Sequence, residues 1–304
     1  MTGKSPLFKL NNGIEIPALG LGVYLSSGDQ TPRAVESAIA GGYRLIDTAA
    51  AYGNEQQVGE GIKGSGIDRS ELFITTKLWM ADYNFEETLR AFDVSLRKLD
   101  LEYLDLYLLH WPSPSTWDQT LASYRAAEKL LSEGRVRAIG VSNFSEKHLE
   151  DLIAATSVVP AVNQIELHPL FTQARMRKAN AARGILTQAW SPIGGTYINH
   201  PREPGKVTRV LDEPVLKDIA RRLHRSAAQV ALRWHFQNGV ATIPKSVHSE
   251  RIAANIEIFD FELTAEDMAA IDALDTGRRN GPEPDVFDLA FLKARQQAQA
   301  QARK

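Results

Sequence analysis

Apolar residues along this chain of 304 residues fall into two patterns. Some form short continuous runs, and others recur every three or four positions through longer stretches that predict amphipathic helices. Because the short runs are continuous and not alternating, they favour strands buried on both faces, as in a parallel sheet. Eight such strands are predicted, at residues 18–24, 44–49, 72–78, 104–110, 137–143, 161–167, 185–191 and 241–246.

Local signals place several other elements between and before these strands. The stretch at 85–99 carries apolar residues at helical spacing, which predicts a helix there. Ser145 is a good N-cap for the helical stretch that follows it, and Thr264 with Asp267 has the capping-box spacing. The Asn-Gly pair within residues 9–16 (KLNNGIEI) predicts a β-hairpin at the start of the chain.

The alternation of strand and helix, eight times over, favours an α/β protein with the (β/α)₈ barrel fold. No linker rich in Pro, Gly or Ser divides the chain, so we expect a single domain over residues 1–304, with its core at 7–277. Residues 278–304 are expected to form a C-terminal loop and a tail that frays. The alternative, a doubly wound sheet, predicts a glycine fingerprint after the first strand, but GLGVYL (20–25) lacks the third glycine.

Composition narrows the possible partners and compartment. The formal net charge of -2 gives no electrostatic case for binding nucleic acid or an anionic membrane. The absence of cysteine excludes disulfides, thiolate catalysis and Cys-ligated zinc. The N-terminus lacks the apolar region of a secretory signal, and no apolar run is long enough for a membrane span. We therefore expect a cytoplasmic monomer that acts on a small molecule.

Polar residues stand where nearly every predicted strand ends. In a barrel, the carboxyl ends of the strands face the active site. The residues at or just after these ends are Asp47, Tyr52, Lys77, Trp79, His110, Trp111, Ser142, Asn143, Gln164, Glu166, His168, Trp190, Ser191, Lys245 and Ser246. Each alone has an ordinary interpretation, such as a solvated strand end, a cap or a packing residue. Their number favours a site.

Asp47, Tyr52, Lys77 and His110 make a chemically coherent set. A phenol has a pKa near ~10, and a neighbouring ammonium lowers it by favouring the phenolate. A carboxylate can hold that ammonium in place, and a neutral imidazole can hydrogen-bond a carbonyl. The set predicts a tyrosine acid/base beside a carbonyl, which suits reduction by an external hydride donor.

Several longer motifs resemble those of the aldo-keto reductase superfamily, over roughly residues 7 to 277. They are DTAAAYGNE (47–55), ITTKLW (74–79), DLYLLHWP (105–112), GRVRAIGVSNF (134–144), AVNQIELHP (161–169) and IPKSVHSERIAAN (243–255). The resemblance implies NADPH-dependent carbonyl reduction on a (β/α)₈ barrel. Trp190 in QAWSPIGG is similar to the bacterial 2,5-diketo-D-gluconic acid reductases, which implies a keto-sugar or small dicarbonyl substrate.

The resemblance also implies roles for individual residues. Asp47, Tyr52, Lys77 and His110 would form the catalytic tetrad, with Tyr52 as proton donor. The cofactor NADP(H) would contact Ser142, Asn143, Gln164, Trp190, Ser191, Lys245, Ser246, Arg251 and Asn255. Of these, Lys245, Ser246 and Arg251 would hold the 2′-phosphate, and Trp190 would stack on the nicotinamide. Tyr24, Trp79 and Trp111 would line the substrate pocket, the loop 194–214 would act as a lid, and His248 has no assigned role.

Two other functions are weighed against this one. A metal-dependent barrel hydrolase could use Asp47, Glu55, His110, Glu166 and His168 as ligands, although the nearby Lys77 would oppose a cation. A non-catalytic barrel that binds NADPH and senses it, with slow turnover, would carry the same residues. Turnover of simple aldehydes without a metal discriminates against both.

Overall fold

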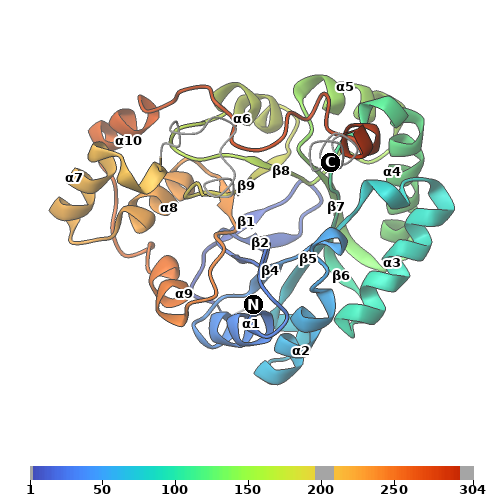
Figure 1. The fold of residues 1–304 in the computed structure, drawn as a ribbon, viewed down its shortest axis with the longest axis horizontal. Helices are drawn as coiled ribbons and strands as arrows, with labels where there is room; N and C mark the ends of the chain where they lie inside the picture. The colour runs from blue at the N-terminus through green and yellow to red at the C-terminus, as the bar shows by residue number, and fades with distance from the viewer. Residues whose placement is uncertain (1–2, 196–208, 295–304) are drawn as a thin grey trace, which may run out of the picture.

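The computed structural model describes residues 3–195 and 209–294. Its centre is a sheet of eight parallel strands in the order β3-β4-β5-β6-β7-β8-β9-β10, surrounded by helices (Figure 1). The strands are β3 (Leu21–Gly22), β4 (Leu45–Asp47), β5 (Phe73–Leu78), β6 (Leu104–Leu109), β7 (Val136–Ser142), β8 (Val162–Glu166), β9 (Leu186–Trp190) and β10 (Ala241–Thr242). Parallel bridges from Leu19 to Thr242 and from Gly22 to Lys245 join the first strand to the last. The predicted (β/α)₈ barrel is thereby confirmed.

Helices follow most of the strands and cover the outside of the barrel. They are α1 (Gln30–Ala40), α2 (Glu55–Ser65), α3 (Phe85–Leu99), α4 (Trp117–Ser132), α5 (Glu146–Ala155), α6 (Ala174–Ala181), α7 (Pro214–Leu223), α8 (Ala227–Gln237), α9 (Ser249–Ile256) and α10 (Ala265–Asp272). The helix predicted at 85–99 has these bounds. Ser145 and Thr264 are N-caps, as expected, and Thr264 forms the predicted capping box with Asp267. Ser145 also forms a capping box, with His148.

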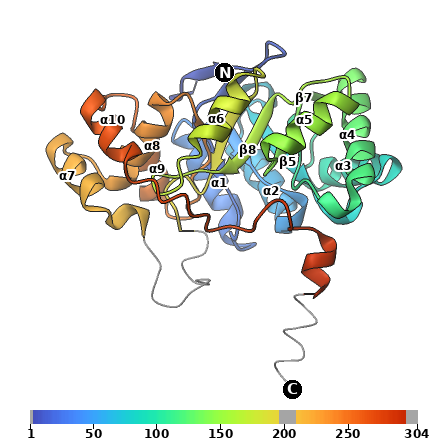
Figure 2. The same ribbon diagram turned by 90° about the horizontal axis from the view of Figure 1, so that it is seen from above.

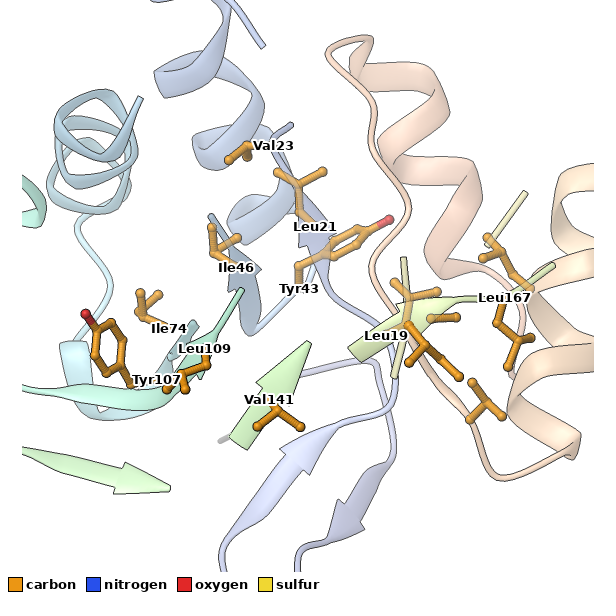
Figure 3. Packing of buried hydrophobic residues seen from close by; sticks show 14 of the residues in the cluster. Leu19, Leu21, Val23, Tyr43, Ile46, Ile74, Tyr107, Leu109, Val141 and Leu167 are labelled. Atoms are coloured by element: carbon orange, nitrogen blue, oxygen red, sulfur yellow. The ribbon is translucent and has the colours of Figure 1, made fainter. Parts of the chain in front are cut away.

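Alternating residues of the strands divide the core into two clusters. Leu106 and Leu108 of β6 belong to a cluster inside the barrel, together with Leu45 and Phe73. Tyr107, between the two leucines, faces outward to the helices, where its ring meets that of Phe92 on α3 at 5.0 Å. Figure 3 shows part of this larger outer cluster. Burial on both faces explains why the strands appear in the sequence as continuous apolar runs.

The predicted N-terminal hairpin is confirmed and lies at one end of the barrel. It pairs β1 (Leu7–Lys9) with β2 (Glu15–Pro17). Leu10 and Ile16 pack into the inner cluster. At its tip, the Asn12 side chain donates a hydrogen bond of 3.0 Å to the carbonyl of Arg137, near the start of β7. The hairpin therefore covers the amino-terminal ends of the strands.

The C-terminal segment, residues 273–294, crosses the opposite end of the barrel (Figure 2). The Thr276 amide donates to the Leu170 carbonyl at 3.0 Å, which ties the segment to the loop after β8. Residues 289–294 are helical. Most of the loop expected to act as a lid, residues 196–208, lies outside the described residues. Within the described ranges, no helix is both long and apolar enough to cross a membrane.

Candidate active site

A cavity of about 740 Å³ opens among the carboxyl ends of the strands. Most of the predicted site residues line it: Tyr24, Asp47, Tyr52, Trp79, His110, Trp111, Ser142, Asn143, Gln164, Trp190, Ser191 and Lys245. Lys77 lies behind the wall, fully buried. Ser246, Arg251 and Asn255 do not line the cavity and lie in the stretch that follows Lys245 into α9.

Lys77 connects a carboxylate to a phenol beneath the cavity. Its Nζ forms an ion pair with Asp47 Oδ1 and donates to the Thr48 carbonyl at 2.8 Å. The same atom lies 3.4 Å from the Tyr52 hydroxyl. The second oxygen of Asp47 accepts a hydrogen bond of 2.7 Å from Gln164 Nε2. The strand ends of β4, β5 and β8 thus assemble one buried polar network.

Burial and pairing act in opposite directions on the two charges. Burial raises the pKa of the Asp47 carboxyl, whereas Lys77 and Gln164 counteract that rise. Burial likewise lowers the pKa of the Lys77 ammonium, and Asp47 counteracts the fall. Each charge therefore depends on the other, because a buried charge without a partner is strongly unfavourable.

The loop after β4 sets the position of Tyr52. Residues Ala50–Tyr52 form a single 3₁₀ turn, which ends at Gly53 in the left-handed region, with φ of 68°. Asn54 then fixes the loop from behind: it accepts 2.9 Å from the Thr48 hydroxyl and donates 2.9 Å to the Val23 carbonyl. From this loop the phenol lines the cavity while its hydroxyl stays within reach of Lys77.

His110 follows β6 and stands next to Tyr52. The two ring centroids are 5.6 Å apart with an interplanar angle of 72°, and Trp79 contacts the other side of the imidazole at 5.3 Å. Burial, and to a lesser extent the charge of Lys77, hold the pKa of His110 well below its ordinary value of 6.5. The ring is consequently neutral near pH 7. A neutral imidazole can hydrogen-bond a carbonyl without acting as an acid itself.

A second polar cluster orients the indole of Trp190. Asn143, held at a φ of 64°, accepts 2.8 Å from Trp190 Nε1 and donates 3.0 Å to the His110 carbonyl. The Ser142 hydroxyl donates 2.8 Å to the Gln164 carbonyl. Gln164 Nε2 is occupied by Asp47 and by Gln188 at 2.8 Å, and its Oε1 has no hydrogen bond within the described chain. An amide donor on a ligand could bind that oxygen.

The predicted phosphate-binding residues lie on the stretch that runs from β10 into α9. Lys245 lines the cavity, and partial burial lowers the pKa of its ammonium. The Ser246 hydroxyl accepts 3.1 Å from the His248 amide, so both residues shape the turn before α9. Arg251 is exposed in the first turn of that helix, where the unpaired N–H groups of a helix start favour an anion. His248, to which no role was assigned from the sequence, is the N-cap residue of α9.

An aromatic part of the cavity wall includes residues that the sequence did not predict. Trp111 contacts Phe287 with ring centroids 4.4 Å apart, and Trp79 lies 6.5 Å from the same ring. Pro282 and Leu292, like Phe287, enter the cavity from the C-terminal segment. In the sequence, these residues stand out only as isolated apolar residues in a polar stretch. That pattern does not show against which part of the barrel the segment packs.

The residues considered as metal ligands are used in other ways. Glu55 is buried beside Thr76, whose hydroxyl donates to it at 2.7 Å, and Lys98 lies 3.9 Å away. Glu166 and His168 are 3.3 Å apart and face the C-terminal segment. Among residues 3–195 and 209–294, no group of three or more His, Cys, Asp and Glu side chains is arranged to hold a metal ion. The geometry gives no support to the metal-dependent hydrolase.

Comparisons with known proteins agree with this geometry. The Aldo/keto reductase family model matches residues 19–276. Morphine 6-dehydrogenase of Pseudomonas putida is 58% identical over 295 residues, covering 96% of this chain and 99% of that one. Glyoxal reductase of Bacillus subtilis is 49% identical over 278 residues, covering 91% and 95%. The crystal structure of a Bombyx mori aldo-keto reductase in complex with NADP has a TM-score of 0.86 at 35% identity, covering 95% and 97%.

The chain therefore belongs to the aldo/keto reductase family. It is an oxidoreductase, and family membership supports carbonyl reduction with a nicotinamide cofactor. The finer likeness to 2,5-diketo-D-gluconic acid reductases stays a prediction, because these relatives carry other names.

Proposed function

We propose that this chain reduces aldehydes or ketones to alcohols with NADPH, and that Tyr52 donates the proton. The observation that carries the proposal is the position of Lys77 Nζ, bonded to Asp47 and 3.4 Å from the Tyr52 hydroxyl. A cation at this distance favours the phenolate that remains when the proton has gone. Tyr52 is therefore the group from which a proton can leave most readily toward the cavity.

His110 orients the carbonyl in this proposal. Its ring is neutral and lies edge-on to Tyr52 at the cavity wall. A carbonyl oxygen that accepts from both side chains is held at the part of the cavity wall that they share. The neutrality of His110 matters, because a protonated ring would compete with Tyr52 as the acid.

The residues fit an NADPH cofactor. The indole of Trp190 is fixed by Asn143 and offers a flat face to the cavity, and Gln164 Oε1 is available to an amide donor such as a carboxamide. Lys245 and Arg251 supply two cations for a 2′-phosphate, next to the start of α9. When bound, the cofactor supplies the hydride. A related structure, 41% identical, was solved with NADPH.

The aromatic part of the cavity wall favours carbonyl compounds with an apolar or aromatic body. Tyr24, Trp79, Trp111 and Phe287 form that wall. Of the lining residues in the described chain, Lys245 is the one Lys or Arg, and it is one of the predicted phosphate-binding residues. Among the described lining residues, a sugar acid would find no further cation for its carboxylate, whereas small dicarbonyl compounds need none. The relatives named above for glyoxal reduction and for morphine dehydrogenation support a small dicarbonyl compound and a larger apolar compound, respectively.

The test is consumption of NADPH with methylglyoxal, a benzaldehyde, a β-keto ester and 2,5-diketogluconate. Tyr52→Phe removes the proton donor but keeps the ring, so turnover should fall by ~100-fold or more, the usual contribution of general acid catalysis. NADPH binding should persist. Tyr103→Phe is the matched control, because Tyr103 stands before β6 under Arg69, away from the cavity.

Activity of Tyr52→Phe within about tenfold of the wild type would refute the proton-donor role. NADPH binding without turnover of any compound in the panel would instead favour the sensing barrel. Turnover that survives a chelator would count further against the hydrolase.

A further inference from the structure

Glu166, the last residue of β8, is a fully buried carboxylate that the reaction proposed above does not use. Its Oε1 accepts a hydrogen bond of 2.6 Å from the backbone amide of Asn280, and its Oε2 accepts one of 2.8 Å from that of Gly281. His168 Nε2 lies 3.3 Å from Oε1 and 3.1 Å from the Asn280 side chain. Two consecutive amides, more than a hundred positions away in the sequence, thus converge on one carboxylate.

These hydrogen bonds are what make the burial of Glu166 possible. A carboxylate withdrawn from water requires donors or a cation, and within the described residues Glu166 has no Lys or Arg partner. The amides of the C-terminal segment take that place. The segment and the carboxylate therefore stabilise each other. If the segment moved away, the Glu166 carboxylate and the two backbone amides would all lose their hydrogen bonds.

Gly281 brings the same segment against the edge of Trp190. A Cβ at Gly281 would lie 2.5 Å from Trp190 Cη2 and 2.8 Å from Glu166 Oε2, so no larger residue fits without movement. At its other edge, the indole donates to Asn143 at 2.8 Å. Trp190 is thus enclosed between the Asn143 amide and the backbone that Glu166 holds.

The segment then continues into the apolar wall of the cavity. Pro282 lines the cavity directly after Gly281, and Phe287 follows with its ring 4.4 Å from Trp111. The path from Glu166 to both faces of the cavity is therefore short. It reaches the indole through Gly281 and the apolar wall through the next few residues.

We propose that Glu166 is a positioning residue that fastens the C-terminal segment across the cavity and so sets the distance between Trp190 and Phe287. Through that distance it determines how well the enzyme binds carbonyl compounds large enough to reach Phe287. The kinetic part of this inference rests on the proposed function, whereas the fastening itself does not.

The fastening is tested by amide hydrogen exchange of the unliganded full-length chain. Glu166→Gln keeps the side-chain volume but replaces one accepting oxygen by a donor, which cannot accept from a backbone amide. We expect exchange of the peptide over residues 278–288 to accelerate by about tenfold, the scale of one lost charge-assisted hydrogen bond. Glu86→Gln, on the exposed face of α3, should leave it unchanged. Unaltered exchange in Glu166→Gln would overturn the proposal whatever the activity.

The specificity is tested by comparing a naphthaldehyde with methylglyoxal. In Glu166→Gln, KM for the naphthaldehyde should rise by about tenfold while kcat changes little, and kcat/KM for methylglyoxal should stay within about threefold. Equal losses for both compounds would overturn the specificity role. If the wild type reduces neither compound, the proposed function fails, and the exchange measurement still decides the fastening.

Gly281→Ala provides a second variant in case Glu166→Gln does not fold. It retains the carboxylate but forces the segment or the indole to move. We expect faster exchange over residues 278–288 and a raised KM for the naphthaldehyde, as in Glu166→Gln. Wild-type values for both in a folded Gly281→Ala protein would contradict the proposed coupling.

Discussion

Lys77 Nζ lies 3.4 Å from the Tyr52 hydroxyl while it is bound to Asp47 and to the Thr48 carbonyl. The ammonium is fixed on two sides before it reaches the phenol, so it cannot turn away to solvent. It is also fully buried, and its only charged partner in the described chain is Asp47. Lys77 therefore contributes both to the stability of the fold and to the proposed proton transfer, and variants can separate these two contributions.

Lys77→Met should lower both the free energy of unfolding and the turnover. Asp47 would remain buried without its cation, and breaking a buried pair in this way costs about 3–5 kcal/mol of the free energy of unfolding. Adding Asp47→Asn removes the stranded charge, so the double variant should regain much of that stability in urea denaturation. Turnover should remain down by ~100-fold in both, because Tyr52 has lost its neighbouring cation. A double variant that recovers turnover together with stability would mean that the pair serves folding alone.

His110 should not titrate in the working range of pH. Burial and Lys77 keep its pKa well below 6.5, so the ring gains a proton only as the pH falls far below that value. We expect kcat/KM for reduction to show no inflection from this group between about pH 6 and 8. His110→Gln, which keeps a donor but cannot ionise, should lower kcat/KM and leave the shape of the profile unchanged. An inflection near the ordinary pKa that disappears in the variant would contradict the neutral role.

His235 should make the fold sensitive to acid. It is fully buried on α8, its side chain bonds the Pro192 carbonyl within the described chain, and burial lowers its pKa to about 3 from 6.5. Below pH 6.5, His235 therefore binds a proton in the unfolded chain, whereas in the folded chain it stays neutral until the pH approaches 3. Its contribution to stability is complete above pH 6.5 and is lost as the pH falls toward 3, by up to ~1.4 kcal/mol per pH unit.

Urea denaturation at several pH values measures this dependence. His235→Gln keeps a side-chain donor for the Pro192 carbonyl, to which His235 Nε2 lies at 2.9 Å, and should flatten the slope below pH 6.5 by about one proton. His224→Asn is the control, since His224 is exposed and adopts a left-handed φ of 53° that Asn tolerates. An identical slope in wild type and His235→Gln would contradict the assignment.

Arg251 should distinguish the two nicotinamide cofactors. Arg251→Met removes a cation that can bind a 2′-phosphate, so Kd for NADPH should rise by roughly tenfold or more while Kd for NADH changes little. Fluorescence titration with each cofactor measures both. Arg221→Met, an exposed position on α7, is the matched control. Equal weakening of both cofactors by Arg251→Met would refute the phosphate-binding role.

The barrel could be predicted from the sequence because each strand is buried on both faces. The ends of the strands were less predictable, most of all where the first strand of the barrel meets the last. The runs at 18–24 and 241–246 give strands of only two residues, Leu21–Gly22 and Ala241–Thr242. Around them the pairing continues as isolated bridges, partly because Pro244 has no N–H to donate. Every other predicted strand lies within two residues of its observed start.

Some residues of the site could likewise be predicted from the sequence, and others could not. Asp47, Lys77 and His110 were recognisable because a charged or titratable residue at the end of an apolar run is conspicuous. Phe287 and the role of Glu166 were not, because both depend on where a segment with no periodicity lies against strands far away in sequence. The local pattern of residues predicts which strand ends carry reactive side chains. Contacts between segments far apart in the sequence determine which other residues pack against those side chains.

Because β1 and β2 cover the amino-terminal end of the barrel, the cavity is approached from one side. All of its described lining residues come from strand carboxyl ends and the segments that follow them. Under the proposed function, two molecules share that approach, and the one seated against the strand ends must arrive first and depart last. Turnover is then an ordered sequence, in which exchange of the spent cofactor has to wait until the alcohol has left. The hairpin, far from any reacting group, leaves both molecules this single approach.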